Sequence, residues 1–347
     1  MKTPKTLLIL ALLLSLIAFG VPTQAQDQPE TVTITLAAYA VPREAYEDVI
    51  PAFQAYWQEK TGQAVIVQES YQASGAQSRA VAGGFEADIV ALSVESDVTR
   101  LVDAGLITHD WKANYNGFVT NSVVVLATRE GNPLEIEDWG DLAGDVEVIT
   151  PDPATSGGAQ WNILAVYGAA RRGFVEGYAA DDEGATEFLT KLLKNVVVFD
   201  RDGRESILTF EYGIGDVAIT YENEIYAGEA AGSTYSVVYP TSTILIENPI
   251  AVVDAYVDEH GTREVAEAFV AFAQSAEAQR IFVENGFRPV NEDVIAEVAT
   301  DEELAEKFPK IEDLFTIEEF GGWSVVRKEL FGDEGRFTAL IAEVAGE

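Results

Sequence analysis

Strand-like and helix-like segments alternate along nearly the whole of this chain, and this order restricts the possible folds more than any other feature of the sequence. Apolar residues alternate with threonine from Thr31 to Ala38, and further β-rich runs follow at 64–67 and 89–94, separated by helix-patterned segments. Such an order predicts an α/β fold, with mostly parallel sheets that helices cover on both faces. In sheets of this kind, ligands bind at the carboxyl ends of the strands.

The first helix-patterned segment combines apolar residues at helical spacing with a proline. The apolar residues are Tyr46, Val49, Ile50, Phe53 and Trp57. We expect them to pack in the core. Pro51 is expected either to kink this helix or to begin a second one.

A second α/β unit is expected to begin near residue 129, after an apolar strand at 122–128 and the turn signal Gly131-Asn132-Pro133. Later strands and helices are expected, in order, at 146–150, 161–170, 196–199, 217–221, 237–239, 244–253, 263–273 and 277–285. The order fits one lobe, a second lobe and a return to the first, with two crossing strands as a hinge. A single large α/β domain fits the same alternation.

The first 25 residues have the pattern of an export signal. Lys2 and Lys5 precede an apolar run from Leu7 to Phe19, and Thr23-Gln24-Ala25 places small residues at the positions that a signal peptidase reads. The run is short for a transmembrane helix. We therefore expect a periplasmic or otherwise extracytoplasmic protein, with an uncleaved anchor as the alternative.

Composition excludes several classes of function. Acidic residues outnumber basic ones 58 to 22, and the resulting charge of -36 argues against nucleic acid or an anionic membrane as a partner. The absence of cysteine excludes disulfides, thiolate catalysis and Cys-ligated zinc. The chain has two histidines and no G-x-S-x-G, P-loop or H-E-x-x-H motif, so we expect no catalytic residue, no metal and no cofactor.

Two Ser-Gly turns are each expected to connect a strand to a helix. They are Ser74-Gly75-Ala76-Gln77 and Ser156-Gly157-Gly158-Ala159. The first N–H groups of a helix lack internal acceptors and carry roughly half a positive charge, so each turn can cradle an oxyanion. Each serine can equally be a simple helix cap. The pattern alone leaves both interpretations open.

The acidic residues near the end of the second unit give weaker indications. Asp200-Arg201-Asp202-Gly203 lacks the further oxygens of a calcium loop and is expected to be a turn. Glu222 and Glu224 are expected to be solvated, although they could form a carboxylate pair.

Further short motifs run in order across nearly all of the chain after the signal segment. With the Ser-Gly turns, they are Ser74-Gly75-x-Gln77, Glu86-Ala87-Asp88, Gly131-Asn132-Pro133, Ile149-Thr150-Pro151, Ser156-Gly157-Gly158-Ala159-x-Trp161-Asn162, Gly213-Ile214-Gly215-Asp216-Val217, Glu222-Asn223-Glu224, Phe287-Arg288-Pro289, Phe315-Thr316-Ile317 and Phe320-Gly321-Gly322-Trp323. In these motifs the chain resembles the periplasmic sulfate/thiosulfate-binding proteins of ABC transporters, a type II periplasmic-binding-protein family.

The resemblance implies two α/β lobes, each a mostly parallel sheet flanked by helices, joined by two hinge strands. Lobe 1 is expected to comprise 30–127 and 245–347, and lobe 2 is expected to comprise 128–244, with C-terminal helices that can touch both. The lobes would close over a desolvated tetrahedral dianion, which then passes to a membrane permease. We expect a monomer.

In the family, uncharged donors hold the ligand. By position, these are the backbone N–H of Ala40, the hydroxyl of Ser74, the side chain of Ser156, the N–H groups of Gly157 and Gly158, the backbone N–H of Gly203 and the side chain of Tyr221. Ala40 stands where the family usually has Asp, and Gly203 stands where it tends to have Ala. Because the main chain donates at position 40, the lost carboxylate should have little direct effect.

Tyr221 stands where the family has tryptophan. An indole only donates, whereas a phenol can donate and accept. Sulfate only accepts hydrogen bonds, while hydrogen phosphate carries a proton that needs an acceptor. Tyr221 is the single possible acceptor among the expected donors, so the selection of anions is expected to be broader than in the family.

We therefore expect a sulfate receptor that closes its lobes on the ligand, without catalysis. Thiosulfate, molybdate and tungstate are the nearest alternatives. A ferric-iron or polyamine receptor is suggested by the acidity, by Tyr221 and by the pair of Glu222 and Glu224, and would place carboxylates in the cleft. An exported hydrolase is a third alternative.

Overall fold

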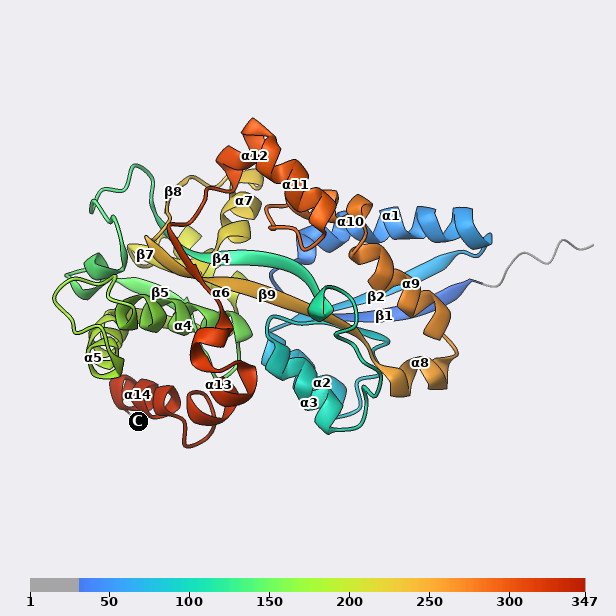
Figure 1. Cartoon of the computed structure of the whole chain (residues 1–347), viewed down its shortest axis with the longest axis horizontal. Helices are drawn as coiled ribbons and strands as arrows, with labels where there is room; N and C mark the ends of the chain where they lie inside the picture. Colours follow the sequence, from blue (N-terminus) through green and yellow to red (C-terminus); the bar gives the residue numbers. More distant parts are fainter. Residues whose placement is uncertain (1–30, 347) are drawn as a thin grey trace, which may run out of the picture.

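The computed structural model describes residues 31–346, so the expected signal segment at 1–25 lies outside the described residues. Within this range, ten strands form one sheet with the order β2-β1-β3-β9-β4-β7-β5-β6, in which β10 also pairs with β9 and β8 with β4. Two groups of helices surround the two ends of this sheet, and two long strands run between them (Figure 1). The fold is α/β, as the alternation of strands and helices predicts, and it has two lobes, as the resemblance to the family implies. None of the described helices has the length and apolar character needed to span a membrane.

Lobe 1 is built on a parallel sheet that helices cover on both faces. Its strands are β1 (Val32–Tyr39), β2 (Val65–Gln72) and β3 (Ile89–Ala91). Its helices are α1 (Arg43–Thr61), α2 (Ser74–Ala82), α3 (Glu95–Asp103), α8 (Asp254–His260), α9 (Arg263–Ala273) and α10 (Ala276–Glu284). Ile34 and Leu36 of β1 pack with α1, α9 and α10, whereas Ala37 belongs to the separate cluster formed with α2, α3 and α8. The period of two along the strand thus places core residues on both faces.

Helix α1 follows the predicted periodicity and runs through its proline without a break. All five predicted apolar residues are buried, and Phe53 packs edge-on against Phe269 with ring centroids 5.0 Å apart. Pro51 lies on the exposed side of the helix. No second helix begins at Pro51, because burial of the opposite face holds the segment together despite the missing backbone donor.

Lobe 2 repeats this arrangement. Its parallel strands are β5 (Val148–Pro151), β6 (Val196–Asp200) and β7 (Val217–Tyr221), and β8 (Tyr235–Val238) joins its sheet through β4. Its helices are α4 (Gly157–Arg171), α5 (Asp182–Leu193), α6 (Gly203–Glu211) and α7 (Glu222–Ala230). Residues of α4 and α5 belong to the large core cluster, while Ile207 and Phe210 of α6 pack with Ile225 of α7 in another cluster.

Strands β4 (Phe118–Arg129) and β9 (Ser242–Val252) connect the lobes. They pair with each other in antiparallel fashion, and every antiparallel pair in the described sheet includes one of them. The sheet is therefore mixed as a whole, while the strands of each lobe core remain parallel to one another. Pro249 lies within β9, as the sequence pattern predicts.

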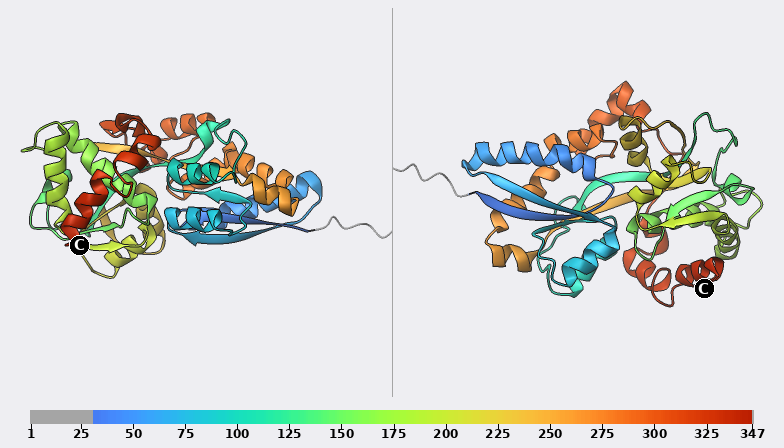
Figure 2. Two further views of the ribbon diagram at one scale, coloured as in Figure 1. Left: turned by 90° about the horizontal axis from the view of Figure 1, so that it is seen from below. Right: turned by 180° about the vertical axis from the view of Figure 1, so that it is seen from behind.

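The C-terminal segment returns along both lobes (Figure 2). It comprises α11 (Glu292–Thr300), α12 (Glu302–Lys307), β10 (Asp313–Phe315), α13 (Trp323–Glu329) and α14 (Arg336–Ala345). Phe337 of α14 packs edge-on against Tyr167 of α4, with ring centroids 4.9 Å apart. Arg327 of α13 lies 3.2 Å from the carboxylate of Asp103 on α3. The segment therefore contacts elements of both lobes.

Candidate anion-binding site

One small cavity lies where the two lobes meet. Lobe 1 contributes the end of β1 and the loops after β2 and β3, and lobe 2 contributes the beginnings of three helices. The lining residues are Tyr39, Ala40, Val41, Ala73, Ser74, Ser93, Pro151, Ser156, Gly158, Asn162, Asp202, Gly203, Ile219, Thr220, Tyr221 and Glu224. The centre of a water-sized sphere can occupy about 10 Å³ of it. The cavity therefore suits one small species rather than an extended molecule.

Four helices begin at residues that line this cavity. Helix α2 begins at Ser74, α4 follows its cap Ser156, α6 begins at Gly203, and α7 follows its cap Tyr221. The first N–H groups of each helix have no intrahelical acceptor, and the helix dipole places partial positive charge there. These helix starts direct partial positive charge at the cavity without a basic side chain, as anion sites do, and the carboxyl groups of Asp202 and Glu224 also line it.

Of the seven sequence-predicted site residues, six line the cavity: Ala40, Ser74, Ser156, Gly158, Gly203 and Tyr221. The seventh, Gly157, is the first residue of α4 and lies against lobe 1. A Cβ atom on Gly157 would lie 3.0 Å from the Cβ atom of Ser93. Glycine at this position therefore lets the start of α4 approach lobe 1 closely.

Ser156 caps α4 while its hydroxyl proton remains available. Its Oγ atom accepts a hydrogen bond from the N–H of Ala159 at 3.3 Å. An oxygen that accepts this bond can still donate its own proton. The two interpretations that the sequence leaves open, a helix cap and a ligand donor, are therefore compatible at this residue.

Ser74 is held differently from Ser156. Its hydroxyl donates to Oδ2 of Asp97 at 2.6 Å and accepts from the N–H of Ser93 at 3.0 Å. In this arrangement the hydroxyl proton is donated to Asp97, while the N–H group of Ser74, in the first turn of α2, has no intrahelical acceptor. The expected role of the Ser74 hydroxyl as a ligand donor stays a prediction.

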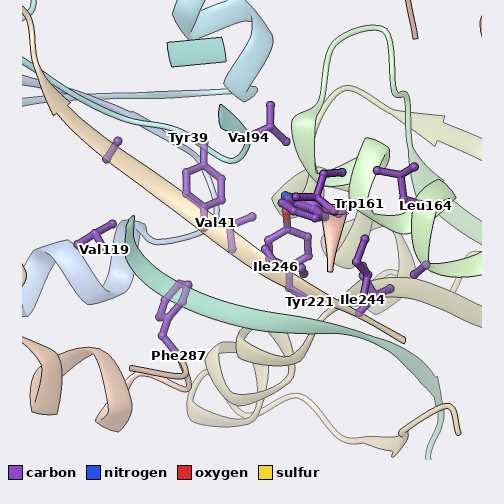
Figure 3. Close-up of a cluster of buried hydrophobic side chains, with 14 of the residues drawn as sticks. Tyr39, Val41, Val94, Val119, Trp161, Leu164, Tyr221, Ile244, Ile246 and Phe287 are labelled. Carbon is purple, nitrogen blue, oxygen red and sulfur yellow. The ribbon is translucent and has the colours of Figure 1, made fainter. Parts of the chain in front are cut away.

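Tyr221 lies at the end of β7, buried between the lobes. Its hydroxyl oxygen is 2.8 Å from Oγ of Ser93, which follows β3 in lobe 1. Burial raises the pKa of Tyr221 far above its ordinary value of 10, so the phenol keeps its proton. Trp161 also bonds to Ser93, and the side chains of Trp161 and Tyr221 lie next to one another in Figure 3. Sequence reasoning did not identify Ser93, which carries no motif of its own.

The structure corrects the expectation that Glu222 and Glu224 are solvated, because both side chains are buried at the start of α7. Glu222 accepts two hydrogen bonds from the guanidinium of Arg288, at 2.7 and 2.8 Å. Glu222 is therefore paired with Arg288, whereas the basic neighbour of Glu224 is Arg204. Sequence reasoning missed this difference because Arg288 is distant in the chain.

Glu224 lines the cavity itself. Nη2 of Arg204 lies 3.2 Å from its Oε1, but the approach lacks hydrogen-bond geometry, and both buried carboxyl oxygens lack a hydrogen-bond partner in the described part of the chain. Burial raises the pKa of Glu224 to about 7, against the opposing effect of Arg204. The carboxyl group is therefore close to half protonated at neutral pH, and a bound anion would favour its neutral form.

Arg204 links the lobes beside the cavity. From α6 in lobe 2, it donates to the carboxylate of Glu44 at 2.6 Å and to the carbonyl of Val41 at 3.2 Å, both in lobe 1. These contacts, together with the bond between Ser93 and Tyr221, cross from one lobe to the other. The structure therefore represents the lobes in a closed arrangement.

Comparisons with known proteins identify the family of this chain. A model of the bacterial extracellular solute-binding protein family matches residues 34–288. The chain is 44% identical to a sulfate-binding protein of Synechococcus elongatus, over 91% of this chain and 89% of that protein. It is 36% identical to a thiosulfate-binding protein of Pseudomonas aeruginosa, over 88% of this chain and 91% of that protein.

A solved structure gives the same result. The sulfate-binding protein SubI from Mycobacterium tuberculosis H37Rv is 41% identical and superimposes with a TM-score of 0.78, covering 87% of this chain and 100% of that chain. All residues that line the cavity fall within the range that the family model matches. The chain therefore belongs to the bacterial extracellular solute-binding protein family, and its relatives there include sulfate-binding and thiosulfate-binding proteins.

Proposed function

We propose that this protein captures sulfate between its two lobes outside the cytoplasm and delivers it to the membrane permease of an ABC importer. The observation that carries the proposal is the meeting of four helix starts, one from lobe 1 and three from lobe 2, at a single small cavity. The names of the relatives, described above, support the same ligand.

The donor set suits a fully ionised tetrahedral anion. Sulfate carries no proton at neutral pH and only accepts hydrogen bonds, so it matches a cavity rich in N–H and O–H donors. Each helix start supplies about half a positive charge, so a few of them approximate the field of one or two cations. The donors proposed are the N–H groups of Ala40, Ser74, Gly157, Gly158 and Gly203 with the hydroxyls of Ser156 and Tyr221.

The mechanism is closure of the lobes. We assign residues 30–127 and 245–347 to lobe 1 and residues 128–244 to lobe 2, with β4 and β9 as the hinge. Only the closed form presents both halves of the donor set, so sulfate shifts the equilibrium toward closure. The receptor acts as a monomer and performs no catalysis, in line with relatives that are named as binding proteins. The segment 1–25 directs export.

Thiosulfate is the second candidate. It is a dianion that shares most of its acceptor oxygens with sulfate, and one relative is named for it. Its terminal sulfur makes it larger and a weaker acceptor on one side. A set of N–H and O–H donors therefore favours sulfate, whose four oxygens all accept hydrogen bonds.

The experiment that tests the proposal is thermal unfolding with sulfate, thiosulfate, molybdate, phosphate, ferric citrate and spermidine in turn. A ligand at 100 times its dissociation constant stabilises the folded protein by about 2.7 kcal/mol. We expect the largest stabilisation with sulfate. The Ser156→Ala variant should lose most of this effect, while Ser324→Ala, at an exposed position of α13, serves as the control. Stabilisation by spermidine or iron and by no oxyanion would contradict the proposal.

A further inference from the structure

Ser93 lies at the centre of the contact between the lobes. It is fully buried, lines the cavity and uses each of its polar groups. Its N–H donates to Oγ of Ser74 at 3.0 Å, and its carbonyl accepts from Trp161 at 2.9 Å and from Asn248 at 3.0 Å. Its hydroxyl lies 2.8 Å from that of Tyr221. Three main-chain bonds therefore fix the position of the Ser93 hydroxyl.

The pair of hydroxyls between Ser93 and Tyr221 contains two protons but only one hydrogen bond. One hydroxyl must donate within the pair, and the proton of the other is then free for a different acceptor. If Tyr221 donates to a bound anion, its oxygen is left to accept from Ser93. The opposite order would make Ser93 the donor to the anion. The geometry of the pair alone allows either order.

The neighbours of the two hydroxyls favour the arrangement in which Ser93 donates to Tyr221 and Tyr221 donates to the anion. The Cα atom of Gly158 lies close to the phenol, since a Cβ atom there would be 3.6 Å from the Tyr221 hydroxyl oxygen and 3.3 Å from Oγ of Ser156. The phenol hydroxyl is thus grouped with the first turn of α4. The Oγ atom of Ser93 instead faces Gly157, the first residue of α4, which does not line the cavity, whereas Ser156 and Gly158 beside the phenol do.

We propose that Ser93 is a specificity-determining residue, whose hydroxyl donates to the oxygen of Tyr221 and thereby makes that phenol a donor-only group toward the anion. The proposal rests on the function proposed above. In this arrangement the oxygen of Tyr221 no longer accepts a hydrogen bond from the ligand, a possibility that the sequence alone leaves open. With the in-plane lone pair of its oxygen occupied, the phenol acts toward the ligand mainly as a donor, as an indole N–H would.

Two physical consequences follow for the bound anion. A hydroxyl that accepts one hydrogen bond becomes a stronger donor, because successive bonds in a chain polarise one another. Phosphate carries at least one proton at neutral pH, and it finds no acceptor at Tyr221 while Ser93 occupies the oxygen. Ser93 should therefore strengthen the binding of sulfate and weaken the binding of phosphate.

The test is calorimetric titration of the full chain with sulfate and with phosphate at one pH, using the wild type, S93A, Y221F and the double variant. S93A should weaken sulfate binding by about 2- to 10-fold, the effect of losing one neutral hydrogen bond. Phosphate affinity should stay constant or rise. Y221F should weaken sulfate binding by about 10- to 100-fold, because its bond is charge-assisted. Adding S93A to Y221F should have little further effect.

A matched control separates this role from simple loss of structure. Ser78 is also fully buried in lobe 1, and its hydroxyl donates to the carbonyl of Asp97 at 2.6 Å without lining the cavity. Ser78→Ala should lower the unfolding temperature and leave the ratio of sulfate to phosphate affinity unchanged. Unfolding of each variant without ligand shows that it is folded.

Two results would overturn the assignment of Ser93. One is an unchanged ratio of affinities in S93A when the wild type binds sulfate. The other is a loss of sulfate affinity in S93A that Y221F does not show, because Ser93 and not Tyr221 would then be the donor to the anion. A wild type that binds neither anion would overturn the function proposed above and this assignment with it.

Discussion

A carboxyl group beside an anion site opposes a second negative charge, so the protonation of Glu224 matters for both stability and binding. Several charged side chains surround it. Burial is the largest influence and disfavours the ionised form of Glu224. Arg204 favours the ionised form, while the nearby carboxylates of Glu44, Asp202 and Glu211 disfavour it. The balance raises its pKa from 4.5 to about 7. The folded protein therefore holds this proton more tightly than the unfolded chain does.

We predict that replacing Glu224 by glutamine stabilises the protein at high pH. As pH rises from 4.5 to about 7, the unfolded chain loses the proton first, so stability falls across this window and stays lower above it. The loss of unfolding free energy across this window corresponds to about 3 kcal/mol. The unfolding free energy of E224Q, measured by urea denaturation from pH 4 to 9, should exceed that of the wild type increasingly above pH 4.5.

The exposed Glu302→Gln variant is the control for this measurement. It removes one carboxylate from the same chain without altering the cavity. A constant difference between E224Q and the wild type at every pH would mean that the carboxyl group of Glu224 is not buried in solution.

Ser74 and Ser156 show what sequence predicts at this scale and what it does not. Both have the same Ser-Gly pattern, yet Ser156 caps α4, whereas the hydroxyl of Ser74 is bound to Asp97. Asp97 follows by 23 positions, and no local rule pairs it with Ser74. Which atoms of a residue remain free for a ligand depends on such distant partners. The predicted donors accordingly stay predictions.

Among the elements, the helix starts define the site, and the glycines there set how closely the lobes approach. Cβ atoms on Gly157 and Gly203 would lie 3.0 Å and 3.2 Å from atoms of Ser93 and Val41 in lobe 1. Neither glycine has a positive φ angle. Their role is therefore to leave space between the lobes rather than to permit an unusual backbone.

We predict that Gly157→Ala weakens sulfate binding by about 10-fold while leaving the unfolding temperature nearly unchanged. Alanine is favourable within a helix, so the fold tolerates it, but its methyl group would meet Ser93 and Val94 and hold the lobes apart. Titration calorimetry measures the affinity, and small-angle scattering measures the closure. In the control, Gly140→Ala, the added carbon has no neighbour closer than 4.0 Å. Unchanged affinity in G157A would show that this contact is not part of the closed form.

The order of elements is the part of the fold that sequence predicted best. The runs at 196–199 and 217–221 correspond to β6 and β7, and the helices at 263–273 and 277–285 to α9 and α10. Their signal is local, since it depends only on periodicity and breakers. The short β10 was missed because three residues carry no periodicity, and the antiparallel pairing of β4 and β9 depends on contacts across the whole chain.

For the whole molecule, the net charge of -36 and the anion site act in opposite directions. The charges lie mostly on the surface and are screened by salt, whereas the dipoles of the helix starts act within the closed cavity. An open groove between the lobes, next to the cavity, carries Arg79, Arg100 and Arg327 among its lining residues. The resemblance of the chain to the sulfate/thiosulfate-binding proteins is confirmed by the comparisons, whereas the exact lobe boundaries stay a prediction.

We predict that added sodium chloride speeds the association of sulfate with the protein. The Debye length shortens from about 30 Å at 0.01 M to about 8 Å at 0.15 M, so the repulsion between the acidic surface and the dianion weakens. Stopped-flow fluorescence should show an association rate that rises several-fold over this range and a nearly constant dissociation rate. An association rate that falls with salt would mean that the arginines of the groove outweigh the acidic surface.

Because each lobe contributes only part of the proposed donor set, release of the anion requires no covalent change in the protein. The influence of a helix start fades within about one turn of the helix, so a rotation that parts the lobes by little more than the width of the ion removes most of the attraction. A transporter that holds the receptor in its parted form would thereby turn a strong binder into a weak one. The energy for unloading can then come from mechanical work at the membrane, with no residue covalently modified.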